Sequence, residues 1–306
     1  MSSLIEQAAQ RLEQLRQAGA EMPATPPPVA QVGATQGYVS EAQPAPPLSR
    51  RVEIDLAALA QAGIVSPNAP RSQIADQYRV IKRPLISNAM GKGASVIAHG
   101  NLIMVTSALP GEGKSFTAIN LAMSIATELD NTVLLVDADV ARPSVMKMLG
   151  LPEGPGLLDL VLGESKDMSS MLLKTNIDKL TILPSGTPHS RATELLASDA
   201  MIRLLDEMAK RYPDRIIVFD SPPLLLTTEA RVLASHMGQV VVVVQAGRTL
   251  QSEVRHALAT IEACPVKLML LNQARTVSKG GYGYGYTYGY GPGMSSGKPD
   301  YPRHQF

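Results

Sequence analysis

The sequence predicts a doubly wound α/β fold, in which helices cover both faces of a mostly parallel sheet. Short apolar runs rich in Val, Ile and Leu alternate with longer segments of helical periodicity. The apolar runs are continuous, as is typical of parallel strands buried on both faces. One run leads directly into a glycine-rich loop and then a helix. Strand, helix and strand in succession imply right-handed crossovers.

The elements follow one another along a single predicted domain, residues 51–275. Helices are expected at 72–83, 114–129, 192–210 and 250–263, and Pro84 should end or kink the first of them. Strands are expected at 102–107, 132–137, 180–183, 216–220, 240–245 and 267–271. No internal repeat is visible in this region.

The two ends of the chain differ in composition from this domain. Residues 1–20 predict a short amphipathic helix, and whether it docks on a partner or frays stays open. A disordered linker rich in Pro and Ala is expected at 21–50, and a flexible tail rich in Gly and Tyr at 276–306. The fold class is therefore one α/β domain with a disordered N-terminal linker and C-terminal tail.

Bulk composition excludes several classes of protein. The chain has 306 residues, 45% of them hydrophobic, which is ample for a core. A net charge of +1 gives no reason to expect nucleic acid as a partner. The single cysteine, Cys264, fits a reducing cytoplasm, and five scattered histidines show no metal-ligand spacing. No apolar run reaches the ~20 residues that span a bilayer, so a cytoplasmic location is expected.

The glycine-rich loop matches a phosphate-binding pattern. Residues 108–115 fit G-x-x-x-x-G-K-[ST], except that Ala108 replaces the first glycine. In such a loop, backbone N–H groups and a helix N-terminus converge on phosphate oxygens. The alternative is a chance glycine-rich turn. The candidate nucleotide-binding residues are Pro110, Gly111, Glu112, Gly113, Lys114, Ser115 and Phe116.

Two further strands end in carboxylates. Asp137 and Asp139 follow one strand, and Asp220 ends another. Ligands of open α/β sheets bind beyond the carboxyl ends of the strands, so these side chains should gather near Ser115. Mg²⁺ prefers oxygen ligands, and the cluster therefore predicts a magnesium site. The alternative is that each aspartate caps a helix or forms a turn.

The tail carries a row of phenolic hydroxyl groups. Tyrosine alternates with glycine or threonine at Tyr282, Tyr284, Tyr286, Tyr288 and Tyr290. Taken alone, such a segment is typical of low-complexity sequence that is prone to aromatic stacking or aggregation. Beside a nucleotide site, the same residues become candidate phosphoacceptors, because donor and acceptor of a phosphoryl group then lie on one polypeptide.

Together these motifs resemble the bacterial tyrosine kinases of the polysaccharide co-polymerase, or capsular exopolysaccharide, family. The family's phosphate loop reads Pro-Gly-Glu-Gly-Lys-Ser, as at 110–115. Aliphatic strands ending in D-x-D and D-x-P and a closing tyrosine cluster follow in the same order, over about residues 70–291. The Tyr/Gly tail is similar to that of the autokinases that accompany exosortase-linked exopolysaccharide clusters.

The resemblance implies an ATP- and Mg²⁺-dependent protein-tyrosine autokinase, active on a neighbouring copy and controlling exopolysaccharide synthesis and export. Lys114 would bind phosphates, Ser115 would bind Mg²⁺, and Asp137 would accept the tyrosine proton. Asp139 and Asp220 would hold the water shell of the metal. Asn272 would contact adenine. The family's arginine after D-x-D-x is Ala141 here, with Arg142 one place later.

The resemblance also implies partners. The family's oligomerisation motif E-x-x-R-x-x-R corresponds to Asp76, Arg79 and Lys82, which implies a homo-oligomer, in the family a ring. The alternative is an ordinary i, i+3 pair at Asp76 and Arg79. A separate membrane-bound chain-length determinant, or co-polymerase, would recruit the chain to the inner face of the membrane. The alternative function within the same fold is that of a ParA/MinD-type ATPase acting as a nucleotide-gated interaction module. Those ATPases carry a signature lysine directly after the first loop position, where this chain has Leu109.

Overall fold

The computed structural model describes residues 50–67, 72–163, 168–211 and 214–274. The chain divides into two compact units, 1–45 and 46–306, and every described residue belongs to the second. The predicted helix at 1–20, nearly all of the predicted linker and the tail at 276–306 lie outside the described residues.

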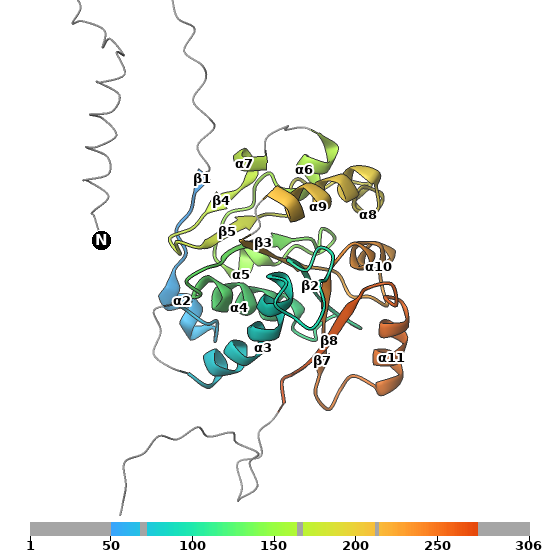
Figure 1. Cartoon of the computed structure of the whole chain (residues 1–306). Coiled ribbons are helices and arrows are strands. Elements are labelled where there is room, and N and C mark those ends of the chain that lie inside the picture. Colours follow the sequence, from blue (N-terminus) through green and yellow to red (C-terminus); the bar gives the residue numbers. More distant parts are fainter. Residues whose placement is uncertain (1–49, 68–71, 164–167, 212–213, 275–306) are drawn as a thin grey trace, which may run out of the picture. The chain divides into compact units, whose positions relative to one another are not determined.

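An eight-stranded sheet forms the centre of the described unit (Figure 1). All neighbouring pairs are parallel except β4 with β5. From one edge to the other, the strands are β1 (Arg50–Arg51), β4 (Leu173–Lys174), β5 (Leu180–Leu183), β3 (Thr132–Asp137), β6 (Arg215–Asp220), β2 (Leu102–Ser107), β7 (Gln239–Gln245) and β8 (Val266–Asn272).

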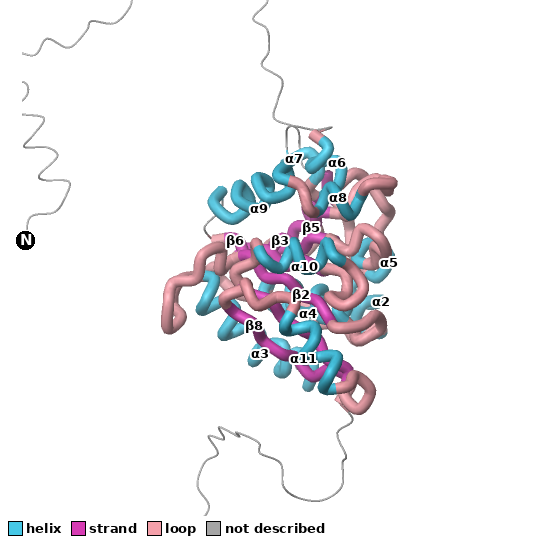
Figure 2. Tube along the Cα trace, turned by 90° about the vertical axis from the view of Figure 1, so that its right-hand side faces the viewer, coloured by secondary structure: helices cyan, strands magenta, loops and turns pink. Residues whose placement is uncertain are grey.

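Helices cover both faces of this sheet, as the 90° view also shows (Figure 2). One face packs on α2 (Leu56–Gln61), α3 (Gln73–Ala89), α4 (Lys114–Ala126) and α5 (Val145–Met148). The other packs on α6 (Leu157–Leu162), α7 (Met168–Met171), α8 (Ala192–Leu196), α9 (Asp199–Arg211), α10 (Thr228–Ser235) and α11 (Gln251–Ala259). None of the helices in the described ranges is both long and apolar enough to cross a bilayer.

Side chains of the central strands alternate between two hydrophobic clusters. In β2, Ile103 and Val105 join the cluster under α3 and α4, whereas Leu102 and Met104 join the cluster on the opposite face. Every residue of β2 is buried. The continuous apolar runs therefore arise because both faces of the parallel strands are covered, which confirms the predicted fold class.

All four predicted helices differ from the observed ones in their bounds, and two of the differences have a clear cause. The helix expected at 192–210 is divided into α8 and α9, because the Ser198 hydroxyl donates to the carbonyl of Leu195 and accepts from the N–H of Met201. Helix α3 continues through Pro84 to Ala89. Its buried Tyr78 and Leu85, one on each side of the proline, anchor both halves in the same core.

Lys82 on α3 is held inside the subunit. Its side chain is 3% exposed, and its ammonium group lies 2.7 Å from Glu128 Oε1 and donates to the Ser124 carbonyl and the Thr127 hydroxyl. Within one subunit, the predicted oligomerisation residue Lys82 therefore contacts α4 and the residues that follow it. Cations stabilise helix C-termini, and this one ties α3 to the end of α4.

Replacing Lys82 should lower stability. Lys82→Ala removes the buried stem and the charged hydrogen bonds at the C-terminal end of α4, so we expect a loss of about 2 kcal/mol. The melting temperature should then fall by roughly 4–8 °C. Lys210→Ala is the matched control, since Lys210 is 74% exposed and 4.0 Å from Asp206. Equal melting temperatures for the two variants would contradict the expectation.

Candidate functional site

The glycine-rich loop connects β2 to α4 at the carboxyl end of the sheet. Gly111 and Gly113 have φ of 84° and 94°, a region that favours glycine. A Cβ atom on Gly113 would lie 2.1 Å from Asn272 Nδ2. Helix α4 begins at Lys114, so its free N–H groups face the loop, as a phosphate site requires.

Glu112 braces this loop from within. It is 2% exposed, and its carboxylate accepts hydrogen bonds from the N–H of Leu109 (2.7 Å) and from the Thr249 hydroxyl. Asn272 Nδ2 donates to the Glu112 carbonyl at 2.8 Å. The Glu112 side chain thus holds the loop in shape. The loop after β7 and the last residue of β8 contact Glu112 there. Thr249 carries no local sequence signal, because it lies 137 positions away from Glu112.

The three predicted aspartates lie together beside Lys114. Asp137 and Asp220 are register partners on β3 and β6, and both side chains are fully buried. Asp139, two residues further on, is 3% exposed and lies 2.5 Å from the Lys114 ammonium group. Parallel strands that end at one edge bring these residues to the phosphate loop, as the sequence predicted.

Asp137 is tied to the segment that follows β3. Its Oδ2 accepts from the N–H groups of Ser144 and Val145, each at 3.0 Å. Burial raises the pKa of Asp137 to about 6, partly offset by these hydrogen bonds. The Ser144 hydroxyl donates to Ser115 Oγ at 2.8 Å. Sequence reasoning missed Ser144, whose role depends on how the chain after β3 returns to the loop.

Asp220 has a different environment. Neither of its carboxylate oxygens has a partner in good hydrogen-bond geometry among the described residues, although the nearby Ser115 hydroxyl lowers the pKa of this carboxyl. Burial raises the pKa of Asp220 to about 7, with the Lys114 charge opposing the rise and Asp137 adding to it. A buried carboxylate without partners is unfavourable when charged, and a cation beside it would remove that cost. These oxygens and the glycine cradle therefore fit Mg²⁺ and a nucleotide phosphate.

Without magnesium, the protein should lose stability as the pH rises. The folded-state pKa of Asp220, about 7, exceeds its ordinary value of 3.8, so folding favours the protonated form. That contribution is complete below pH 4 and disappears as the pH passes 7, with a size on the order of 4 kcal/mol. Melting in EDTA at pH 5 and pH 8 should show a smaller loss for Asp220→Asn than for wild type. An equal loss in both proteins would contradict the assignment.

Other predicted residues lie around this centre. Pro110 is exposed on the loop, and Phe116 is half-buried on α4. Arg142 is exposed, and its N–H donates to Asp139 Oδ1 at 3.2 Å. Asp76 and Arg79 form an exposed ion pair of 2.6 Å on α3.

The structure bears differently on the predicted acceptor tyrosines and on the predicted metal site. The five candidate acceptor tyrosines of the tail lie outside the described residues. Across the described ranges, no three His, Cys, Asp or Glu side chains are arranged to hold a metal directly.

Comparison with known proteins places this site in a family. Residues 100–270 match a family model described as an AAA domain. The chain is 32% identical to the tyrosine-protein kinase YwqD of Bacillus subtilis over 225 residues, covering 73% of this chain and 91% of that protein. The chain belongs to the bacterial tyrosine kinase family. These findings do not extend to the exosortase-associated subgroup.

Other members of the family differ in length. The tyrosine-protein kinase ptk of Acinetobacter johnsonii is 33% identical over 60% of this chain, but the match covers only 25% of that protein. A solved structure, the chimerical protein CapA2B2, is 29% identical with a TM-score of 0.57, covering 73% of this chain and 93% of that one. The shared part is therefore the domain that carries the phosphate loop and the aspartates.

Proposed function

We propose that this chain is an ATP-dependent protein-tyrosine autokinase that phosphorylates Tyr282, Tyr284, Tyr286, Tyr288 and Tyr290 of a neighbouring copy. The observation that carries the proposal is the meeting of Lys114, Ser115 and three buried aspartates at one end of the sheet. Membership of the bacterial tyrosine kinase family supports the same reaction. The acceptor row on the same polypeptide supplies the substrate.

The residues of the site have distinct roles in this proposal. Backbone N–H groups of the loop and the Lys114 ammonium group bind the phosphates, and Asn272 borders the nucleotide. Ser115 would hold Mg²⁺, and Asp139 and Asp220 its water shell; the metal would neutralise charge on the transferring group. Asp137 accepts the phenolic proton. Its pKa of about 6 suits that task near neutral pH.

Release of Lys114 from Asp139 is the step that prepares the site. The ammonium group lies 2.5 Å from Asp139 Oδ2, so it must exchange this carboxylate for phosphate oxygens when the nucleotide binds. The exchange keeps the ammonium paired throughout, since a phosphate is also anionic. It also frees Asp139 to accept hydrogen bonds from the water shell.

The proposal extends to assembly and location. The exposed ion pair of Asp76 and Arg79 on α3 is available to a second copy, which supports a homo-oligomer in the form of a ring. A membrane-bound co-polymerase would bring the chain to the inner face of the cytoplasmic membrane. A relative, ExoP of Rhizobium meliloti, is named a succinoglycan biosynthesis transport protein, which supports a role in exopolysaccharide synthesis and export.

Incubation with ATP and Mg²⁺ tests the reaction. Purified protein should gain phosphotyrosine, seen with an antibody and mapped by mass spectrometry to residues 282–290. Mixing a catalytically inactive full chain with an active chain that lacks the tail should label the inactive one, since transfer occurs between copies. ATP turnover without phosphotyrosine, even with a membrane partner present, would instead favour the nucleotide-gated interaction module.

A further inference from the structure

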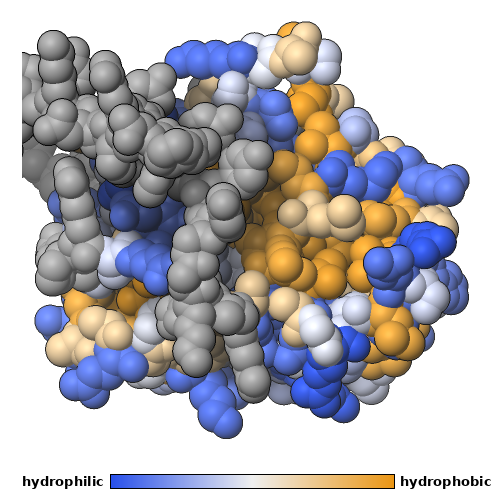
Figure 3. Space-filling view, turned by 90° about the horizontal axis from the view of Figure 1, so that it is seen from below, coloured by the Kyte–Doolittle hydropathy of each residue, from blue (hydrophilic) through white to orange (hydrophobic). Residues whose placement is uncertain are grey.

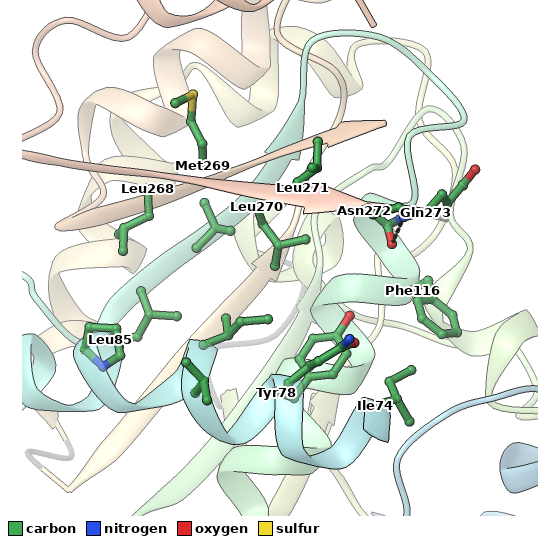
Figure 4. A pocket seen from close by; sticks show the side chains of 16 residues that line it. Ile74, Tyr78, Leu85, Phe116, Leu268, Met269, Leu270, Leu271, Asn272 and Gln273 are labelled. Carbon is green, nitrogen blue, oxygen red and sulfur yellow. Dashed lines mark hydrogen bonds between the residues drawn. The ribbon is translucent and has the colours of Figure 1, made fainter. Parts of the chain in front are cut away.

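An apolar groove of about 800 Å³ lies between helix α3 and the edge strand β8. In Figure 4, Leu268 and Leu270 point from β8 toward α3, while Met269 and Leu271 point to the opposite side. The floor and walls of the groove include Ile74, Tyr78, Ile81, Leu85 and Phe116. Figure 3 shows a broad hydrophobic area on the face of the protein that is seen from below.

Strand β8 offers an open edge beside this groove. It is the last strand of the sheet and pairs only with β7 among the described strands. In a strand, successive N–H and C=O groups alternate in direction, so part of the β8 backbone points away from β7. Met269 and Leu271 are 65% and 64% exposed. A long, apolar, unpaired edge of this kind is suited to receive another strand.

The chain itself supplies a segment with the matching pattern. The described part ends at Ala274, which lines the groove directly after β8. From 281 to 291, tyrosine alternates strictly with glycine or Thr287. In an extended strand, such alternation places all five tyrosines on one side. Residues 273–280 lie between the two segments and allow the chain to turn back.

We propose that residues 281–291 dock on β8 as an added antiparallel strand, with the tyrosine rings in the groove. The apolar walls fit aromatic rings, and the side-chain amides of Gln77 and Gln273 border the groove, where they can bond phenolic hydroxyls. Covalent linkage raises the local concentration of this occupant above that of a second copy or a separate partner.

Phosphorylation would release the docked segment, and this part alone rests on the proposed function. Each phosphate adds nearly two negative charges. None of the described residues that line the groove is Lys or Arg, so a phosphotyrosine there would be buried without a cation. Asn272 lines the groove and its side chain also donates to the Glu112 carbonyl. Docking or release of the tail would therefore act on the phosphate loop through Asn272.

Hydrogen–deuterium exchange can test the docking without any phosphoryl transfer. The comparison uses Lys114→Met, in the full chain and in a chain that ends at Ala274. We expect the amides of β8 to exchange at least tenfold more slowly in the full chain, and residues 281–291 to be protected with them. Val80→Glu in the groove wall should remove the difference. Val96→Glu, at a site 86% exposed and outside the groove, is the matched control.

Several results would overturn the proposal. One is equal exchange of β8 in the two chains, and another is exchange of 281–291 at the rate of an unstructured peptide. Protection that grows with protein concentration would assign the groove to a second copy. Protection lost on deletion of residues 1–20 would assign it to the N-terminal segment. Because the exchange of Lys114→Met is measured without phosphoryl transfer, these outcomes are independent of whether the wild-type protein is a kinase.

Discussion

Lys114→Met should lose at least a hundredfold in autophosphorylation rate. The ammonium group has a position on the phosphate loop that a neutral side chain cannot replace, because only a cation offsets charge on the transferring phosphoryl group. In the free protein the same group lies 2.5 Å from Asp139, within a cluster of three carboxylates. The rate is measured as phosphotyrosine formed over time with ATP and Mg²⁺.

Loss of folding must be separated from loss of catalysis. Lys114→Met leaves Asp139 buried without its cation, so the melting temperature and circular dichroism of the variant are recorded first. Lys174→Met serves as the matched control, since Lys174 is exposed on β4. It should retain full activity. A folded Lys114→Met that labels as fast as this control would refute the assignment of the phosphate loop.

Removal of the tail should abolish nearly all phosphotyrosine. A chain that ends at Lys279, or one with the five alternating tyrosines changed to Phe, lacks the acceptors while the site at Lys114 is untouched. We expect more than tenfold less phosphotyrosine in both. The physical reason is that both chains lack the phenolic hydroxyl groups that would accept the phosphoryl group.

The control for the tail is the single change Tyr301→Phe, which preserves the alternating row. Tyr301 is a further candidate acceptor in the tail, so this variant should keep most of the wild-type label, because the other five tyrosines remain. Mass spectrometry decides between acceptors by locating each phosphate. Full labelling of the chain that ends at Lys279 would show that the acceptors lie elsewhere, for example at Tyr38 or Tyr78, and would end the tail assignment. Tyr78 is buried on α3, and burial raises the pKa of its phenol, so it is a poor acceptor.

Long buried strands were predictable because their physical signal is local. The strands at 102–107, 132–137 and 180–183 have the expected bounds, since a strand covered on both faces is apolar throughout. Short elements were not predictable. Strands β1 and β4 have two residues each and helix α5 has four, too few for any periodicity to appear. Contacts with the rest of the fold stabilise them.

The functional residues divide in the same way. Lys114, Ser115 and the aspartates were predictable because they belong to contiguous motifs at the ends of strands. Thr249 and Ser144 were not, because each reaches the loop from a distant segment. Lys82 was likewise assigned from a motif, by resemblance to an oligomerisation helix, and only the packing of α3 on α4 shows that its side chain is buried within one subunit.

The sequence by itself determined the parallel sheet, the phosphate loop and the gathering of three carboxylates, since these follow from apolar runs, glycine positions and the ends of strands. Only the tertiary structure decided the charge state and the partners of those groups. Burial raises the pKa of Asp220 to about 7, and Glu112 turns into the protein to hold the loop. Desolvation and long-range hydrogen bonds depend on the whole packed fold, and no local pattern of residues contains them.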